Sequence, residues 1–200
     1  MNVFPLGIKG SMFYVGRSGT PYSYAVSGDV SGLGVSSGGT TNMIYVPKNI
    51  NDITLTDANG NLLSGAPKQQ VWNQLNSYIN SIPCLASARG TIMGRNACRN
   101  PWQDIINARI AKDFHVAGQS FELSWDIFNL PNLLDRDWGL YKQVTPFEDA
   151  DILYTQGFDP TNHRFAYQYT PTPKQVVTDF GTGVFEPSVW RMQVGVHYAF

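Results

Sequence analysis

The end of the chain, residues 188–200, constrains the fold more than any other stretch. Every second residue there is apolar or aromatic, and the residues between them are polar or small. Because a strand places successive side chains on opposite faces, this alternation predicts a two-faced β-strand. The pattern fits a strand of a soluble sandwich. It also fits a tilted membrane-barrel strand, which needs about 9–11 residues. The apolar positions are Trp190, Met192, Val194, Val196, Tyr198 and Phe200, and between them lie Arg191, Gln193, Gly195, His197 and Ala199.

Composition narrows the class of protein. Only 14% of the 200 residues are charged, whereas an ordinary soluble domain has about 25%. The net charge of -1 provides no basic surface for nucleic acid, so no nucleic-acid partner is expected. The chain contains no run of about 18 apolar residues, and residues 1–5 lack the charged and apolar segments of a signal peptide. If the chain lies in an outer membrane, we expect it to be a piece of a longer protein.

Three further strands are predicted. Residues from about 6 to 17 alternate loosely, whereas 102–115 and 120–130 alternate more strictly and are joined by a short turn at 116–119. The two stricter strands form a hairpin with one apolar and one charged face. The polar face of a sandwich would meet bulk water, and that of a barrel would meet the lumen. The candidate lumen-facing residues are Arg109, Asp113, Glu122 and Asp126, with Arg191, Gln193 and His197 on the last strand.

Two long regions, about 25–101 and 131–187, separate these strands and are predicted to hold little regular structure. Residues 27–41 are rich in Gly and Ser and predict a mobile loop, and Asn59-Gly60 indicates a small hairpin. Apolar residues at three-to-four spacing between Pro67 and Pro83 predict an amphipathic helix. Two such regions are unusual in a compact soluble domain and ordinary for external loops of an outer-membrane barrel. The layout favours an all-β, antiparallel transmembrane barrel with two extracellular loops.

Cys84 and Cys98 are the only cysteines. An even pair that closes a short loop predicts a disulfide in an oxidising compartment, and two free thiols would be expected in a reducing cytosol. No histidine lies near them to complete a four-ligand zinc site.

The sequence argues against an enzyme. The histidines, His115, His163 and His197, are scattered, and no nucleophile elbow, zinc helix or phosphate loop accompanies them. The pair Glu148 and Asp149 is interpreted as solvated loop, and the run from Asp135 to Asp137 as a salt-bridged turn. We therefore expect no catalytic residue, no cofactor and no metal site.

Several segments share their order and spacing with one known family. They are Arg17–Tyr22, Asn42–Pro47, Cys98–Trp102, Arg109–Phe114, Asp126–Leu134 and Trp190–Phe200. Together they resemble the C-terminal end of TonB-dependent outer-membrane receptors, with the nearest likeness to the subgroup that carries an N-terminal carboxypeptidase-regulatory-like domain. The resemblance implies the last four or so strands of a 22-stranded barrel with an internal plug, which imports a substrate across the outer membrane of a Gram-negative cell. The energy would be coupled from the inner membrane.

The resemblance also implies partners. These are the lipid bilayer, the upstream strands and plug of the same protein, the TonB complex (through an N-terminal part that this chain lacks) and the barrel assembly machinery. Tyr198 and Phe200 would form the assembly signal. Relatives often carry a calcium-like loop where this chain has Asp29–Gly34, but a single carboxylate remains here and Leu33 stands where a ligand belongs, so no calcium site is predicted. The alternative to transport is a soluble or surface β-sandwich that binds a ligand or partner.

Overall fold

The computed structural model of this chain is mostly β. It divides into two compact units, and each is described by itself: unit 1 comprises 1–19, 101–143 and 175–200, and unit 2 comprises 20–100 and 144–174. Within the described residues no helix is both long and apolar enough to cross a membrane. The residues described are 2–4, 7–30, 42–144, 149–171, 176–177 and 188–199.

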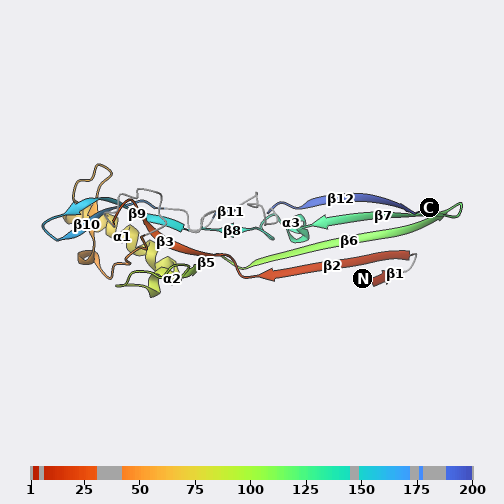
Figure 1. The fold of residues 1–200 in the computed structure, drawn as a ribbon, viewed down its shortest axis with the longest axis horizontal. Helices are drawn as coiled ribbons and strands as arrows, with labels where there is room; N and C mark the ends of the chain where they lie inside the picture. The colour runs from red at the N-terminus through yellow and green to blue at the C-terminus, as the bar shows by residue number, and fades with distance from the viewer. Residues whose placement is uncertain are drawn as a thin grey trace. The chain divides into compact units, whose positions relative to one another are not determined.

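Unit 1 is built on a five-stranded sheet in which every neighbouring pair is antiparallel. Its long strands lie in the stretches that alternate in sequence, and they run side by side in Figure 1. β1 and β12 form the two edges of the sheet. In order across the sheet, the strands are β1 (Asn2–Phe4), β2 (Ile8–Arg17), β6 (Gln103–Val116), β7 (Gln119–Phe128) and β12 (Arg191–Ala199).

The β6–β7 hairpin closes through a two-residue turn. Val116 pairs with Gln119, and the residues between them, Ala117 and Gly118, have φ angles of 53° and 81°. Two consecutive positive φ angles are the mark of a type I′ turn, whose twist matches that of the strands it joins. This turn fixes the register of the hairpin and therefore which side chains share a face.

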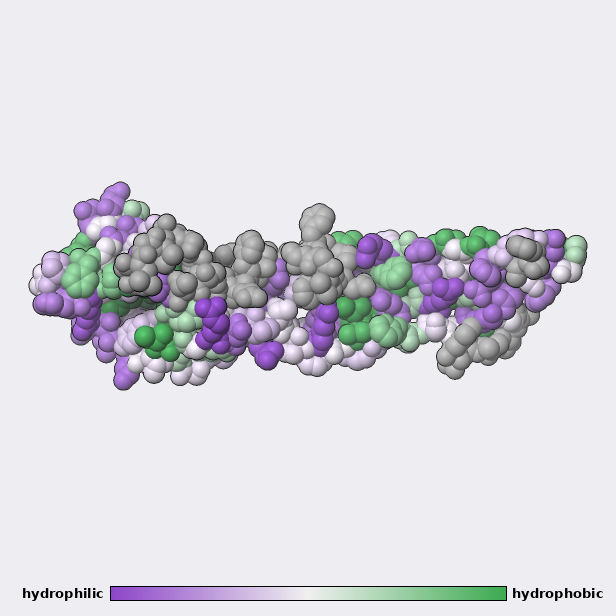
Figure 2. Space-filling view, viewed as in Figure 1, coloured by the Kyte–Doolittle hydropathy of each residue, from purple (hydrophilic) through white to green (hydrophobic). Residues whose placement is uncertain are grey.

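The registers gather apolar side chains on one face of the sheet. Ile110, Trp125 and Val194 stand opposite one another across β6, β7 and β12, and other rows repeat this arrangement. These side chains are exposed, with Val194 at 69% and Val196 at 73%. Figure 2 shows apolar and hydrophilic patches on the surface over these strands.

The end of β7 is held by Asn129, which is buried and has a left-handed φ of 55°. Its backbone N–H donates to Asn107 Oδ1 at 2.9 Å, and its Nδ2 donates to the carbonyls of Gly139 and Ser188, each at 3.0 Å. The short helix α3 (Leu130–Leu134) starts directly after it, and β8 (Lys142–Gln143) pairs with β11 (Val176–Val177). One amide side chain thus joins three segments of unit 1.

Unit 2 has a second five-stranded sheet, which is mixed: β10 and β4 are parallel, as are β3 and β9. The order across it is β4 (Thr54–Thr56), β10 (Arg164–Tyr169), β9 (Asp149–Asp159), β3 (Pro21–Ser27) and β5 (Cys98–Arg99). Its helices are α1 (Gly65–Ser81), α2 (Pro83–Ser87) and the 3₁₀-helix η2 (Ile50–Asp52).

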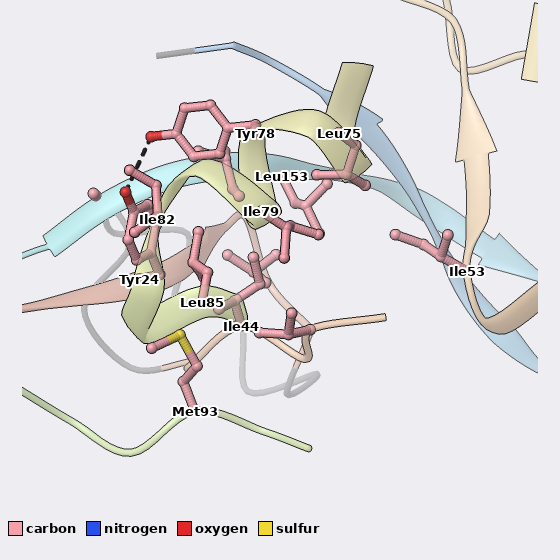
Figure 3. Packing of buried hydrophobic residues seen from close by; sticks show 14 of the residues in the cluster. Tyr24, Ile44, Ile53, Leu75, Tyr78, Ile79, Ile82, Leu85, Met93 and Leu153 are labelled. Carbon is pink, nitrogen blue, oxygen red and sulfur yellow. Dashed lines mark hydrogen bonds between the residues drawn. The ribbon is translucent and has the colours of Figure 1, made fainter. Parts of the chain in front are cut away.

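The core of unit 2 lies between helix α1 and this sheet (Figure 3). Leu75 and Ile79 of α1 are fully buried, as are Leu55 and Leu153 of the sheet. Burial of each such side chain contributes about 1.5–3 kcal/mol. Tyr24 enters the same core and shares a hydrogen bond of 3.0 Å between its hydroxyl and that of Tyr78, so the buried phenols satisfy each other.

The expectation of little regular structure in 25–101 and 131–187 was wrong. Those regions supply most of the unit 2 sheet and all of its helices. In β3 the larger residues Tyr22, Tyr24 and Val26 alternate with the small residues Ser23, Ala25 and Ser27. The run is short and begins at Pro21, a residue that usually indicates an interrupted strand. Tyr22 to Val26 are buried without interruption, so both faces of β3 are covered. Its partner β9 lies more than 120 residues away in the chain, so no local signal pairs them.

Smaller predictions within unit 2 are confirmed by the structure. The helix expected between Pro67 and Pro83 is α1. At the Asn59-Gly60 turn, Thr56 pairs with Leu62, and the Leu63 N–H donates to the Leu55 carbonyl at 2.9 Å. Most of the loop predicted at 27–41 lies outside the described residues.

The predicted disulfide between Cys84 and Cys98 is present. Cys84 lies in α2 and Cys98 begins β5, so the bond ties the helical layer to the edge of the unit 2 sheet. The two Cα atoms are 5.5 Å apart, within the usual range for a disulfide.

We predict that replacing both cysteines by serine lowers the free energy of unfolding of unit 2. The bond closes a loop with a sequence separation of 14. A cross-link of this length lowers the entropy of the unfolded chain and thereby stabilises the folded state by about 3 kcal/mol. Denaturant unfolding of the double variant, monitored by hydrogen exchange at the amides of α1, measures the change. Unfolding unaltered by the double substitution would show that the bond adds no stability.

Candidate functional site

The polar face of the unit 1 sheet brings together the residues predicted to face a lumen. Arg109 stands opposite Asp126, which stands opposite Gln193. In the same way, Asp113, Glu122 and His197 form a second row. Arg191 lies two positions from Gln193 and so shares its face. All seven candidates therefore belong to one surface.

Salt bridges connect this surface across three strands. Glu122 accepts from Lys9 at 3.2 Å and from Arg109 at 3.0 Å. Lys9 also contacts Asp113 at 2.6 Å, and Arg109 contacts Asp126 at 3.5 Å. Lys9 was not among the predicted site residues, although the alternation of its strand places it on the polar side. Glu122 is the centre of the network, since it pairs with both cations.

The network is open to water. The side chain of Arg109 is 47% exposed, and those of its partners are about one-fifth to one-third exposed. Exposed ion pairs contribute little to stability because water and salt screen them. Their effect is on placement, because each charge is fixed in a position along the sheet. Such a surface can contact water, a polar solute or a charged protein surface, but not an apolar one.

Aromatic side chains occupy both ends of the apolar face. At one end the Tyr14 hydroxyl donates to Asp104 Oδ1 at 2.7 Å, and Trp102 Nε1 donates to the same oxygen at 2.9 Å. At the other end the rings of Phe121 and Tyr198 lie 4.9 Å apart. The phenol and the indole thus keep their polar atoms bonded while their rings stay exposed. Phe200, the second residue of the predicted assembly signal, lies outside the described residues.

Unit 2 contains a pocket that sequence reasoning missed. It has a volume of about 350 Å³ and lies where β10 runs parallel to β4. Tyr45 donates its hydroxyl to Asp52 Oδ2 at 2.7 Å, and the Lys48 N–H donates to the same oxygen at 3.0 Å. Arg164 Nη1 donates to the Asn51 carbonyl at 2.6 Å. The pocket is lined by Tyr45, Asp52, Ile53, Thr54, Arg164, Phe165 and Tyr167.

These contacts determine which lining groups are charged. The Lys48 N–H, followed by the Tyr45 hydroxyl, lowers the pKa of Asp52 below its ordinary value, so its carboxylate is ionised at neutral pH. The same hydrogen bond to Asp52 raises the pKa of Tyr45, which keeps its phenol protonated. The pocket therefore holds one carboxylate and one guanidinium.

Only a weak sequence signal pointed to this pocket. Phe165 and Tyr167 alternate with smaller or polar residues as in a strand, but they lie in a region expected to be irregular. Tyr45 belongs to a segment on which the family resemblance rests. The residues meet because β4 and β10 pair in parallel across more than 100 residues of chain, and a pairing of that kind leaves no local pattern.

The remaining sequence candidates are dispersed. His115 faces Ser120 near the tip of the β6–β7 hairpin, and His163 lies in a turn with a φ of 53°. Asp135 Oδ1 accepts from the Asp137 N–H at 2.9 Å, as in a local turn. Within the described ranges, no group of three or more His, Cys, Asp and Glu side chains is arranged to hold a metal ion. Glu148 and residues 31–34 of the segment tested for calcium ligands lie outside those ranges.

We predict that Glu122→Lys destabilises unit 1 in a salt-dependent way. The change places a third cation beside Lys9 and Arg109, and their repulsion weakens as salt shortens the Debye length from roughly 30 Å at 0.01 M to 3 Å at 1 M. The thermal unfolding temperature should therefore fall most at low salt. Gln119→Lys, an exposed change at the hairpin turn, is the matched control. Equal effects of the two changes at every salt concentration would contradict a charge network at Glu122.

We predict a second, pH-dependent effect at Asp52. Its pKa is lowered in the folded protein, so its stabilising effect is complete above the ordinary value of 3.8 and disappears as the pH falls through the folded-state value. Asp52→Asn should therefore unfold at a lower temperature than the wild type at neutral pH. The difference should shrink when the pH falls below 3.8. A difference that stays constant down to the most acidic pH tested would show that the ionised carboxylate is not the stabilising form.

The chain was compared with protein-family models, with curated proteins and with solved structures, and nothing in any of these three comparisons matches it.

Proposed function

We propose that this chain is the C-terminal part of the barrel of a TonB-dependent outer-membrane receptor, which imports a substrate with energy coupled from the inner membrane. The observation that carries the proposal is the division of the unit 1 sheet into an exposed apolar face and an ion-paired polar face. The order and spacing of the sequence segments that resemble this family support it.

The apolar face suits lipid. Val194, Val196 and Met12 are mostly exposed, and leaving a large side chain of this kind in water forgoes roughly 1.5–3 kcal/mol. From Asp104 to Phe114, β6 rises roughly 34 Å at 3.4 Å per residue, or about 26 Å across a bilayer at a tilt near 40°, against an apolar band about 25 Å tall in known barrels. The aromatic side chains at both ends of the face correspond to the two interfacial girdles.

The polar face suits a water-filled interior. Arg109, Glu122 and Lys9 form salt bridges on the side of the sheet opposite the lipid-facing residues. In a membrane barrel these side chains would line the lumen or contact the plug, where water and polar groups satisfy them. His197 and Gln193 on the last strand would extend the same lining.

The edges of the sheet call for neighbouring strands. β12 pairs with β7 on one side, and within a bilayer the N–H and C=O groups on its other side must also be bonded. In the proposed barrel the first strand of the same protein provides those bonds. The two long insertions between the strands form unit 2. Unit 2 would then be an extracellular element that contacts the substrate.

The alternative is a soluble or surface-attached ligand-binding module. The buried core of unit 2 favours it, since a domain with its own core can fold in water. This alternative requires that a protein partner or a second layer cover the apolar face of unit 1. The two functions therefore differ in what contacts Val194.

We predict that Val194→Arg, made in the full-length protein, makes folding into lipid vesicles less favourable. Val194 lies near the middle of β12 on the apolar face, and an arginine near the bilayer midplane costs about 2–4 kcal/mol. Gln193→Arg is the matched control, because the neighbouring side chain points to the polar face, and it should fold nearly as the wild type does.

Labelling gives an independent readout on the same two positions. A cysteine at position 193 should react with a water-soluble maleimide in whole cells or vesicles, and one at 194 should react only after the membrane is dissolved in detergent. The opposite order would place the register wrong by one residue. A chain that stays folded, monodisperse and monomeric without detergent would rule out the barrel.

A further inference from the structure

We propose that the pocket of unit 2 binds an uncharged sugar, with one ring held between aromatic walls and a pair of opposite charges. Every lining residue belongs to unit 2 and to the described part of the chain. The argument depends on the walls of the pocket, its polar groups, their net charge and its size.

Aromatic rings form much of the wall. Tyr45, Phe165 and Tyr167 line the pocket, and Phe165 is braced by Phe158 in an edge-to-face contact with 5.6 Å between ring centroids. A braced ring presents a fixed, weakly negative face. The C–H groups on one side of a sugar ring suit such a face. They carry slight positive charge, and they give up no strong hydrogen bond to water when the ring covers them.

The polar groups provide both hydrogen-bonding roles. Both bonds to Asp52 end on its Oδ2, so the carboxylate keeps acceptor capacity at Oδ1. Arg164 donates one N–H to the Asn51 carbonyl, and a guanidinium has five N–H donors in all. A sugar hydroxyl donates one hydrogen bond and accepts others, so neighbouring hydroxyls can bond to Asp52 and to Arg164 at the same time.

The charges select against ionic ligands. Asp52 and Arg164 both line the pocket and bring opposite charges to it. An anion attracted by Arg164 would be repelled by Asp52, and a cation would meet the reverse situation. An uncharged ligand with several hydroxyl groups keeps both attractions and avoids both repulsions.

The size sets the length of the ligand. A volume of about 350 Å³ is at the lower end of ligand pockets, which span roughly 300–1,000 Å³. That space suits one or two sugar rings. If the chain belongs to an importer, as proposed above, the pocket would capture a saccharide before import. The assignment of a saccharide as the imported substrate therefore rests on the proposed function, whereas the binding of a sugar by the pocket does not.

The test is a ligand-observed NMR titration of the full-length protein with glucose, galactose, N-acetylglucosamine, maltose and cellobiose. A detergent without a sugar headgroup is required, since a maltoside would compete. At least one sugar should bind with a saturable signal. Asp52→Asn and Arg164→Gln should each weaken it about tenfold or more, because each removes a hydrogen bond to a charged group.

Arg99→Gln is the matched control, since Arg99 is an exposed arginine of unit 2 outside the pocket lining, and it should bind as the wild type does. Thermal unfolding of each variant identifies any loss of binding that comes from misfolding. Absence of saturable binding by any sugar, or equal binding by all variants, overturns the proposal. Stronger binding of a dipeptide zwitterion than of any sugar overturns it in favour of a peptide site.

The same preparation separates this proposal from the proposed function. Sugar binding by a protein that does not fold into vesicles would contradict the receptor while leaving the pocket intact. Correct insertion without sugar binding would contradict the pocket alone.

Discussion

The cross-strand register of β6, β7 and β12 is the constraint on which the rest of unit 1 depends. The type I′ turn at Ala117 and Gly118 sets the pairing of β6 with β7, and β12 pairs with β7 so that apolar residues lie opposite apolar ones. A shift of one residue would place Arg109 among Trp125 and Val194 and would move apolar side chains among the charges. The salt bridges of Glu122 and the exposed apolar face therefore both result from this register.

Unit 2 is stabilised differently from unit 1. It buries its own core under α1, and the Cys84–Cys98 bond ties that helical layer to the sheet edge. Its mixed sheet also brings Asp52 and Arg164 to one pocket, although they are far apart in the chain. A stable core beneath the pocket matters for recognition, because lining side chains on a rigid support lose less entropy when a ligand binds.

Asn129 shows how a sequence motif can serve architecture rather than chemistry. It lies in a segment that resembles the receptor family, where a functional role would be a natural reading. In the structure its side chain is buried and bonds to the carbonyls of Gly139 and Ser188. Replacing it would leave those carbonyls without their donor, which is costly for buried groups. This motif therefore marks where three segments of unit 1 are joined.

The sequence by itself determined the four long strands of unit 1, the face on which their side chains lie, the helix between two prolines and the disulfide pair. These depend on local periodicity and short-range spacing, which the amino-acid order carries directly. Only the tertiary structure decided the unit 2 sheet and its pocket. β3 is a short strand that is buried on both faces, and β4 meets β10 through a parallel pairing of distant segments. Contacts of that kind arise from packing of the whole unit, and no window of sequence contains them.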